Sequence, residues 1–483
     1  MSFSFISALG SLLVAQSTSI NMAIGGCCVL GCGFGAQPLL HVVSSEVLPR
    51  RWRSWGQAAD IASNSVGGLL GMYVGAALNR TNDPASKGFR HFNYMTMALF
   101  LASGLLCMVV YNPPPQPLQK ELVLRQKLGR LDWGGYFLIT VGLTLFSVGL
   151  SSFESPYEWS DPHVSAVWAV GMVFLCGLGL YETKFKKDGM FHHGLFSGNR
   201  NFTIACVCVF VDGIAFFGAN TYFAFQIIVM YTNGDTVLAA TAYSTLFYAA
   251  AVFAVLTGWY CARTKTVRLA TVASNVISTV FFVCMATANR HSGKAVWGYP
   301  PIIGVGMGMS LLTLVTAAQL STPPELISIA SGIFISLRSV GATIGVVVFN
   351  ALFSAAMKQL GANVARAVGG GLAPAQIGKL AAALLTQDKD ALASIPGITP
   401  TIIQVGREAL LDTYAVAFSR VWTAGACALA LATIGTLISP SSKNGPLCLL
   451  PFFCTALSNA VAVWLPVLMT LFVCTSLSGN VIV

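Results

Sequence analysis

The residues best able to do chemistry lie inside long apolar stretches of the chain. Asp212, Phe216, Asn220 and Phe223 recur every three or four residues, so on a helix they share one face, and Gln226 follows them. A carboxylate and an amide interleaved with aromatic rings suit a bulky amphipathic ligand better than an ion. Asp212 itself has two interpretations. It binds substrate or a proton, or it forms a structural ion pair.

Other ionisable residues stand near the ends of similar stretches. Asp60 and Glu46 lie close to the basic cluster Arg50–Arg53, which favours a structural or gating salt bridge. Arg338 lies deep in its stretch and is expected to be a structural or gating partner. An ionisable group inside a membrane costs a few kcal/mol, so each of these residues requires a partner or a cavity.

A proton-coupling residue must be a carboxylate that changes its protonation state. Burial in a medium of low dielectric constant favours the neutral, protonated carboxyl. Asp212 lies deepest, so we expect it to be the first candidate, and Asp60 the second.

The composition decides what kind of molecule carries these residues. Of 483 residues, 55% are hydrophobic and only 9% are charged, whereas a soluble chain has roughly 25% charged residues. So few charges cannot cover the surface of a soluble enzyme, and a disordered chain or disulfide scaffold is excluded as well. The sequence predicts an all-α polytopic membrane protein.

Stretches of about 20 apolar residues, each long enough to cross the hydrocarbon core, occur twelve times. They lie near 2–21, 23–48, 56–78, 91–111, 133–152, 164–181, 202–229, 239–261, 267–288, 297–320, 326–357 and 414–438. The tail 446–477 would be a thirteenth, whereas the polar segment 358–413 predicts a short surface helix or a loop. No charged residue precedes Glu46, so a cleaved signal peptide is not expected.

Basic residues set the orientation. The loops near 50–53, 120–130, 184–200 and 263–268 carry fourteen Lys and Arg, and the opposite short loops carry five. The positive-inside rule therefore places the first set, and the N-terminus, in the cytoplasm. The acidic segment 154–161 and the sequon at Asn79, a glycosylation candidate, then lie outside.

Glycines four residues apart recur in several predicted spans and predict close helix crossings. They are Gly31 and Gly35; Gly67, Gly71 and Gly75; Gly304 and Gly308; and Gly341 and Gly345. Such crossings suit bundles that rock against each other.

Several strings resemble major facilitator superfamily antiporters. Residues 33–38 and 45–53 resemble the fourth helix and the loop after it, and the Gly67–Gly75 stripe resembles the antiporter motif, with Met72 in place of its proline. Gly258 to Arg263 is similar to the cytoplasmic loop motif, and residues 131–135 and 157–160 resemble the linker of the fourteen-helix drug:proton antiporters. Within this group the chain is most similar to the fungal trichothecene efflux pump and siderophore transporter branch.

The resemblance implies a domain organisation. Residues 1–112 would be the remainder of an N-terminal bundle, 113–200 cytoplasmic linkers with two linker helices, 201–440 a C-terminal bundle, and 441–483 an atypical hydrophobic tail. If residues 2–21 correspond to the third helix of the family, the first two helices and the loop motif after them are missing. We therefore expect the chain as given to transport poorly.

The predicted function is proton-coupled efflux of a bulky amphipathic molecule, such as a toxin, drug or siderophore, by alternating access. The partners would be this small molecule, protons and the bilayer; dispersed basic residues argue against nucleic acid, and a monomer is expected. We expect a multi-pass protein of the plasma membrane, or else of the vacuole or vesicles. No cofactor is called for, and the thirteen Cys show no metal spacing.

Alternatives remain open. A membrane-embedded enzyme would need clustered catalytic groups, but the six His are scattered. A transport-inactive truncated homologue or a membrane sensor stays possible, since helices would be missing.

Overall fold

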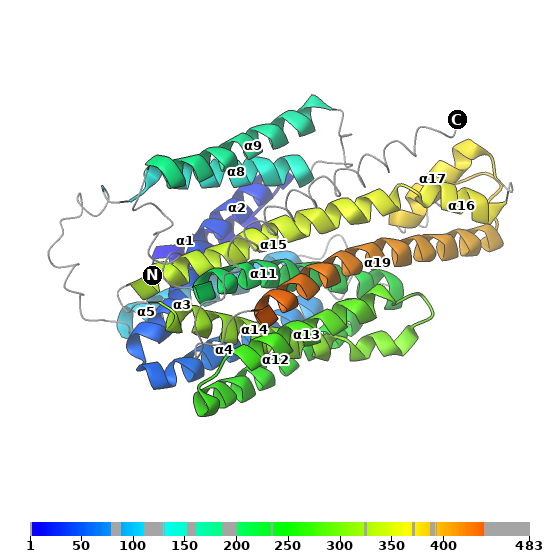
Figure 1. Cartoon of the computed structure of the whole chain (residues 1–483). Coiled ribbons are helices and arrows are strands. Elements are labelled where there is room, and N and C mark those ends of the chain that lie inside the picture. The colour runs from blue at the N-terminus through cyan, green and yellow to red at the C-terminus, as the bar shows by residue number, and fades with distance from the viewer. Residues whose placement is uncertain are drawn as a thin grey trace.

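The computed structural model is a bundle of long helices that lie roughly side by side (Figure 1). It describes residues 2–78, 88–110, 129, 131–151, 161–185, 200–232, 235–322, 326–369, 372–386, 392 and 394–438. Every regular element in this part of the chain is helical. The predicted fold class, an all-α membrane protein, is confirmed at this level.

The N-terminal helices are α1 (Ser2–Ala15), α2 (Ile20–Gly33), α3 (Gln37–Val47), α4 (Arg53–Leu78) and α5 (Gly88–Val110). The span expected at 23–48 is interrupted, because a short 3₁₀ turn at Phe34–Ala36 separates α2 from α3. Gly33 and Gly35 weaken a helix here, and Pro38, which has no amide hydrogen to donate, suits the first turn of a new helix.

Helices α8 (Trp133–Ser151) and α9 (Pro162–Leu180) form a pair, and α8 also contacts α15. Asp161 caps the start of α9 by accepting the amide hydrogen of His163 over 2.9 Å. This donated hydrogen bond stabilises the carboxylate and lowers the pKa of Asp161. Pro162 follows at the first helical position, where a missing amide hydrogen costs nothing.

The C-terminal helices form the larger part of the bundle. They are α11 (Arg200–Gln226), α12 (Thr236–Thr264), α13 (Arg268–Ala286), α14 (Pro300–Leu320), α15 (Ile327–Met357), α16 (Leu360–Val368), α17 (Pro374–Thr386) and α19 (Pro400–Ile438). Asp235 caps the start of α12. The helix ends at Thr264, and the next residue, Lys265, has a φ of 55° in the left-handed region.

Within the described residues, nine helices are long and apolar enough to cross a membrane. The other three predicted spans hold shorter helices: α1 at 2–21, α2 and α3 at 23–48, and the apolar part of α8 at 133–152. The polar segment 358–413 differs more from the prediction. Its first part forms α16 and α17, whose Leu360, Val364 and Leu380 are buried, and α19 begins at Pro400 instead of near 414. The sequence did not predict these helices clearly, because many small residues separate their large apolar residues and weaken the apolar pattern.

The glycine pairs of the C-terminal helices make the close crossings that the sequence predicted. A Cβ added at Gly304 or Gly308 would collide with backbone oxygens of α12, and one at Gly341 with the backbone of α11. At Gly31, Gly67 and Gly71 an added Cβ would meet no atom of the described residues within 4 Å, so this part of the chain makes no close crossing at these three glycines. Glycine spacing shows where a close approach is possible, whereas the neighbouring helix decides whether it occurs.

The two groups of helices meet along α4 and α12, with further contacts of α4 with α14 and of α3 with α15. Gly258 of α12 lies against Ala58 and Ser54 of α4, and the hydroxyl of Tyr73 in α4 is 2.8 Å from that of Ser244 in α12. Polar and close backbone contacts therefore join the N-terminal to the C-terminal helices.

Candidate functional site

The carboxylate of Asp212 in α11 is bound by an arginine of α15. The Arg338 Nε lies 2.8 Å from the Asp212 Oδ2, and the side chains are only 7% and 9% exposed. The Ser310 hydroxyl of α14 donates to the other carboxylate oxygen. Asp212 is thus the meeting point of three helices.

The guanidinium of Arg338 also lies over two aromatic rings of α11. Its central carbon is 4.5 Å from the ring centre of Phe216 and 5.7 Å from that of Phe217. A cation over a ring face is attracted to the π electrons, so the rings and the carboxylate together hold Arg338 in place. Gly213 allows this close approach, because a Cβ there would collide with the Arg338 carbonyl. The spacing of Asp212 and Phe216 predicted that they share one helix face. It did not indicate that Arg338 packs beside them.

The other predicted cavity residues of α11 are bound to neighbouring helices. Asn220 accepts a hydrogen bond from the hydroxyl of Tyr243 in α12, whose ring stacks on Phe223 at 5.4 Å. Gln226 accepts one from the indole of Trp422 in α19 over 2.7 Å. Phe223 and Gln226 are fully buried, so they face packed protein instead of an open space. Their role in binding a substrate stays a prediction.

An aromatic cluster on α11, α15 and α19 was missed at the sequence level. Phe225, Phe353, Tyr414 and Phe418 have neighbouring ring centres 5.0 to 6.2 Å apart. Phe225 is 39% exposed, so one edge of the cluster is accessible. The spacing of Tyr414 and Phe418 would have put both on one helix face, but the sequence does not tell which helices meet there.

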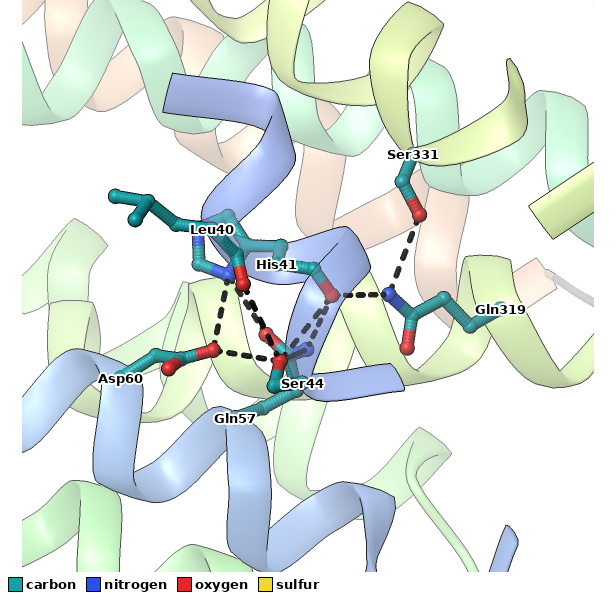
Figure 2. A network of polar contacts seen from close by, with 7 residues as sticks. All are labelled: Leu40, His41, Ser44, Gln57, Asp60, Gln319 and Ser331. Carbon is teal, nitrogen blue, oxygen red and sulfur yellow. Dashed lines mark hydrogen bonds and ion pairs between the residues drawn. The ribbon is translucent and has the colours of Figure 1, made fainter. Parts of the chain in front are cut away.

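A second polar network lies where α3 crosses α4 (Figure 2). The Nδ1 of His41 is 2.7 Å from the Oε1 of Gln57 and 3.8 Å from the Oδ2 of Asp60. The hydroxyl of Ser44 donates to the same Asp60 oxygen over 2.8 Å. Asp60 therefore has His41 and Ser44 as partners in this network. The expected salt bridge to the cluster Arg50–Arg53 stays a prediction, because the side chain of Arg50 lies outside the described residues.

This second network extends to the C-terminal helices. The Nε2 of Gln319 in α14 donates to the backbone carbonyl of His41 and to the Ser331 hydroxyl of α15, over 3.2 Å each. Figure 2 shows the His41 ring on the side of Asp60 and its carbonyl oxygen on the side of Gln319. One residue of α3 thus connects α4 with α14 and α15.

The remaining predicted residues are dispersed. Arg53 begins α4, Arg263 lies exposed in the last turn of α12, and Gly75 packs near the ring of Phe92. The side chains of Glu46 and Arg50, the glycosylation candidate Asn79, and the segments 111–128 and 439–483 lie outside the described residues. The gating roles of these residues stay predictions.

Comparison with known proteins agrees with the helical bundle. The profile of a family described as fungal trichothecene efflux pump (TRI12) matches residues 5–444. The trichothecene efflux pump TRI12 of Trichoderma arundinaceum is 23% identical over 91% of this chain and 73% of its own length. The MFS-type transporter ucsD of Acremonium sp is 24% identical, over 72% of this chain and 58% of its own length. The citrate exporter 1 of Yarrowia lipolytica is 24% identical over 67% of this chain and 47% of its own length.

Proposed function

The chain belongs to the fungal trichothecene efflux pump family of major facilitator superfamily transporters, and we propose that it exports a bulky amphipathic small molecule in exchange for protons. Membership makes it a multi-pass membrane transporter rather than an enzyme. The substrate, the coupling to protons and the plasma membrane as its location are our proposals.

The observation that carries the proposal is the buried pair of Asp212 and Arg338 beside aromatic rings, where α11, α14 and α15 meet. Packing alone does not require two charges there, and burying them is expensive. The half-buried Phe216 and the partly accessible Phe225 supply apolar surface on the same helix. Charge with aromatic surface suits a ligand that is apolar with a few polar groups.

The two carboxylates differ in what protonation would do. If Asp212 took up a proton, Arg338 would keep its charge in a buried position without a counter-charge, which is costly. Asp60 has a histidine as its neighbour, and histidine can itself gain or lose a proton near neutral pH. We therefore place proton coupling at the pair of Asp60 and His41, with the Asp212–Arg338 pair holding α11, α14 and α15 together.

The test uses inside-out membrane vesicles that contain the product of the full transcript. Acidifying the vesicle lumen should drive uptake of a fluorescent amphipathic probe, rhodamine 6G, and a protonophore should abolish it. Absence of any uptake that depends on the pH difference would contradict proton-coupled export and would leave an inactive homologue or a sensor.

Two variants then assign the coupling residue. Asp60→Asn should flatten the dependence of transport on pH, whereas Asp212→Asn should lower transport at every pH without flattening it. Asp412→Asn serves as the control, because Asp412 is 61% exposed and pairs with Arg290 at the surface. A flat profile for Asp212→Asn and an unchanged one for Asp60→Asn would return the coupling to Asp212.

A further inference from the structure

The hydrogen bonds around His41 define the protonation of its ring. The Nε2 of Gln57 donates to the His41 carbonyl and to the Ser44 hydroxyl, over 3.1 and 3.0 Å. The Oε1 of Gln57 is therefore the atom that faces the ring, and it can only accept. Hence Nδ1 of His41 carries a hydrogen, and in the neutral ring Nε2 is the atom that can bind a proton.

Opposite charges act on this buried ring from the two groups of helices. His41 is only 7% exposed. Of the helices packed on α3, α4 brings the carboxylate of Asp60 and α15 the guanidinium of Arg338, and both act electrostatically on the ring. The α14 residue in the network, Gln319, is neutral. A positive charge on His41 is thus attracted toward Asp60 of α4, whereas the charge of Arg338 is paired with Asp212.

We propose that His41 is the proton-binding site of this transporter, and that the bound proton loosens the contact between α3 and the C-terminal helices. This inference rests on the proposed proton-coupled export. The proton enters at Nε2, and the imidazolium pairs with Asp60, 3.8 Å away. Proton uptake thereby gives the half-buried carboxylate of Asp60, which the Ser44 hydroxyl already binds, a positively charged partner.

The direction of the effect fits export in exchange for protons. The network lies near the end of the bundle that the basic loops assign to the cytoplasm, and Gln319 closes it by bonding to the His41 carbonyl. When His41 is protonated, attraction to Asp60 draws α3 toward α4 and away from Gln319, which weakens the contact between α3 and the C-terminal helices. The proton-loaded protein would therefore open toward the cytoplasm, where an exporter must release its proton and take up substrate.

The first test compares two histidines that each lie beside an aspartate. His41→Asn keeps an amide hydrogen near the position of Nδ1 for Gln57 but cannot bind a proton. In the vesicle assay we expect this variant to transport rhodamine 6G. The change of its transport rate with pH should be at least tenfold smaller than that of the unaltered protein. His163→Asn is the control, because His163 is exposed beside Asp161.

The outcomes separate this inference from the proposed function. If the unaltered protein transports with the pH difference and His41→Asn keeps the same pH profile, His41 is not the proton site, although proton-coupled export stands. If the unaltered protein shows no such transport, the proposed function itself fails.

The second test measures the opening of the contact without any substrate. Ser331 is 3% exposed, so a thiol in Ser331→Cys, made in a background without reactive native cysteines, should react slowly with a water-soluble maleimide. Acidification should accelerate this labelling at least severalfold relative to Thr264→Cys, an exposed thiol that corrects for the intrinsic effect of pH. Adding His41→Asn should abolish the acceleration. The proposed loosening would be overturned if the labelling rate of Ser331→Cys changed with pH in the same way as that of the exposed thiol in Thr264→Cys.

Discussion

At the scale of single residues, the bundle contains two carboxylates in opposite electrostatic situations. Asp212 faces a permanent cation and a hydroxyl, so its negative charge has a fixed counter-charge. Asp60 faces a histidine and a serine, so the charge of its surroundings changes with protonation. The sequence identified both carboxylates as unusual and ranked Asp212 first by its depth. It could not identify their partners, which lie 98 and 126 positions away from Asp212 and 16 and 19 positions away from Asp60.

The Asp212–Arg338 pair gives a prediction about stability. Arg338→Met removes the cation and leaves a buried carboxylate alone, so we expect a loss of about 3–5 kcal/mol. Adding Asp212→Leu to Arg338→Met should restore most of this loss, since the uncompensated charge disappears. A double-mutant cycle of unfolding in detergent measures the coupling between the two sites.

Arg290 provides the control for this cycle, because it pairs with Glu408 and Asp412 at the surface. Arg290→Met should cost at most about 1 kcal/mol. A similar loss for Arg290→Met and Arg338→Met would show that burial does not matter for the pair.

At the scale of helices, crossings in the C-terminal part depend on glycine more than on hydropathy. Gly304 and Gly308 bring α14 against α12, and Gly341 and Gly345 bring α15 against α11. The same spacing in α4 at Gly67 and Gly71 meets open space. The spacing of glycines along one helix identifies only one of the two surfaces in a contact. The sequence could therefore indicate the glycine faces but not the helices that pack against them.

We predict that Gly308→Val disrupts the crossing of α14 and α12, because even a Cβ would collide with the Ala250 carbonyl. Overpacking of this kind costs about 1–3 kcal/mol, so the midpoint of thermal unfolding in detergent should fall. Gly67→Val is the matched control and should leave the midpoint within error. Equal effects of the two substitutions would contradict the assigned crossing.

At the scale of the whole molecule, composition alone determined the class of protein, and apolar length located helices at all twelve expected places. The caps at Asp161 and Asp235 begin two of these helices a few residues before the apolar stretches that were predicted. The candidate site was predicted less completely. The network of His41, Gln57, Gln319 and Ser331 depends on contacts between distant helices, which a periodic pattern on one helix cannot reveal.

The predicted topology can be tested on two loops that the structure describes. In intact cells, a cysteine at His291 should react with an impermeant maleimide, whereas one at Lys265 should react only after permeabilisation. The reason is that the basic loop 263–268 belongs to the cytoplasmic set and the loop near 290 to the opposite one. Labelling of both positions in intact cells would refute this orientation.

The burial of α14 has a consequence for how the protein is made. In an apolar 18-residue stretch of the helix Ala295–Leu320, which contains α14, 72% of the residues are buried, against 6% in the corresponding stretch of α5, and yet the mean hydropathy values are 1.7 and 1.8. A helix surrounded by protein has no need of such apolarity in the finished bundle. Each segment must first pass from the translocation channel into lipid before its neighbours assemble, and insertion selects for apolar residues. The composition of α14 therefore satisfies the requirements of membrane insertion, while its buried Ser310 and Gln319 satisfy those of the assembled transporter.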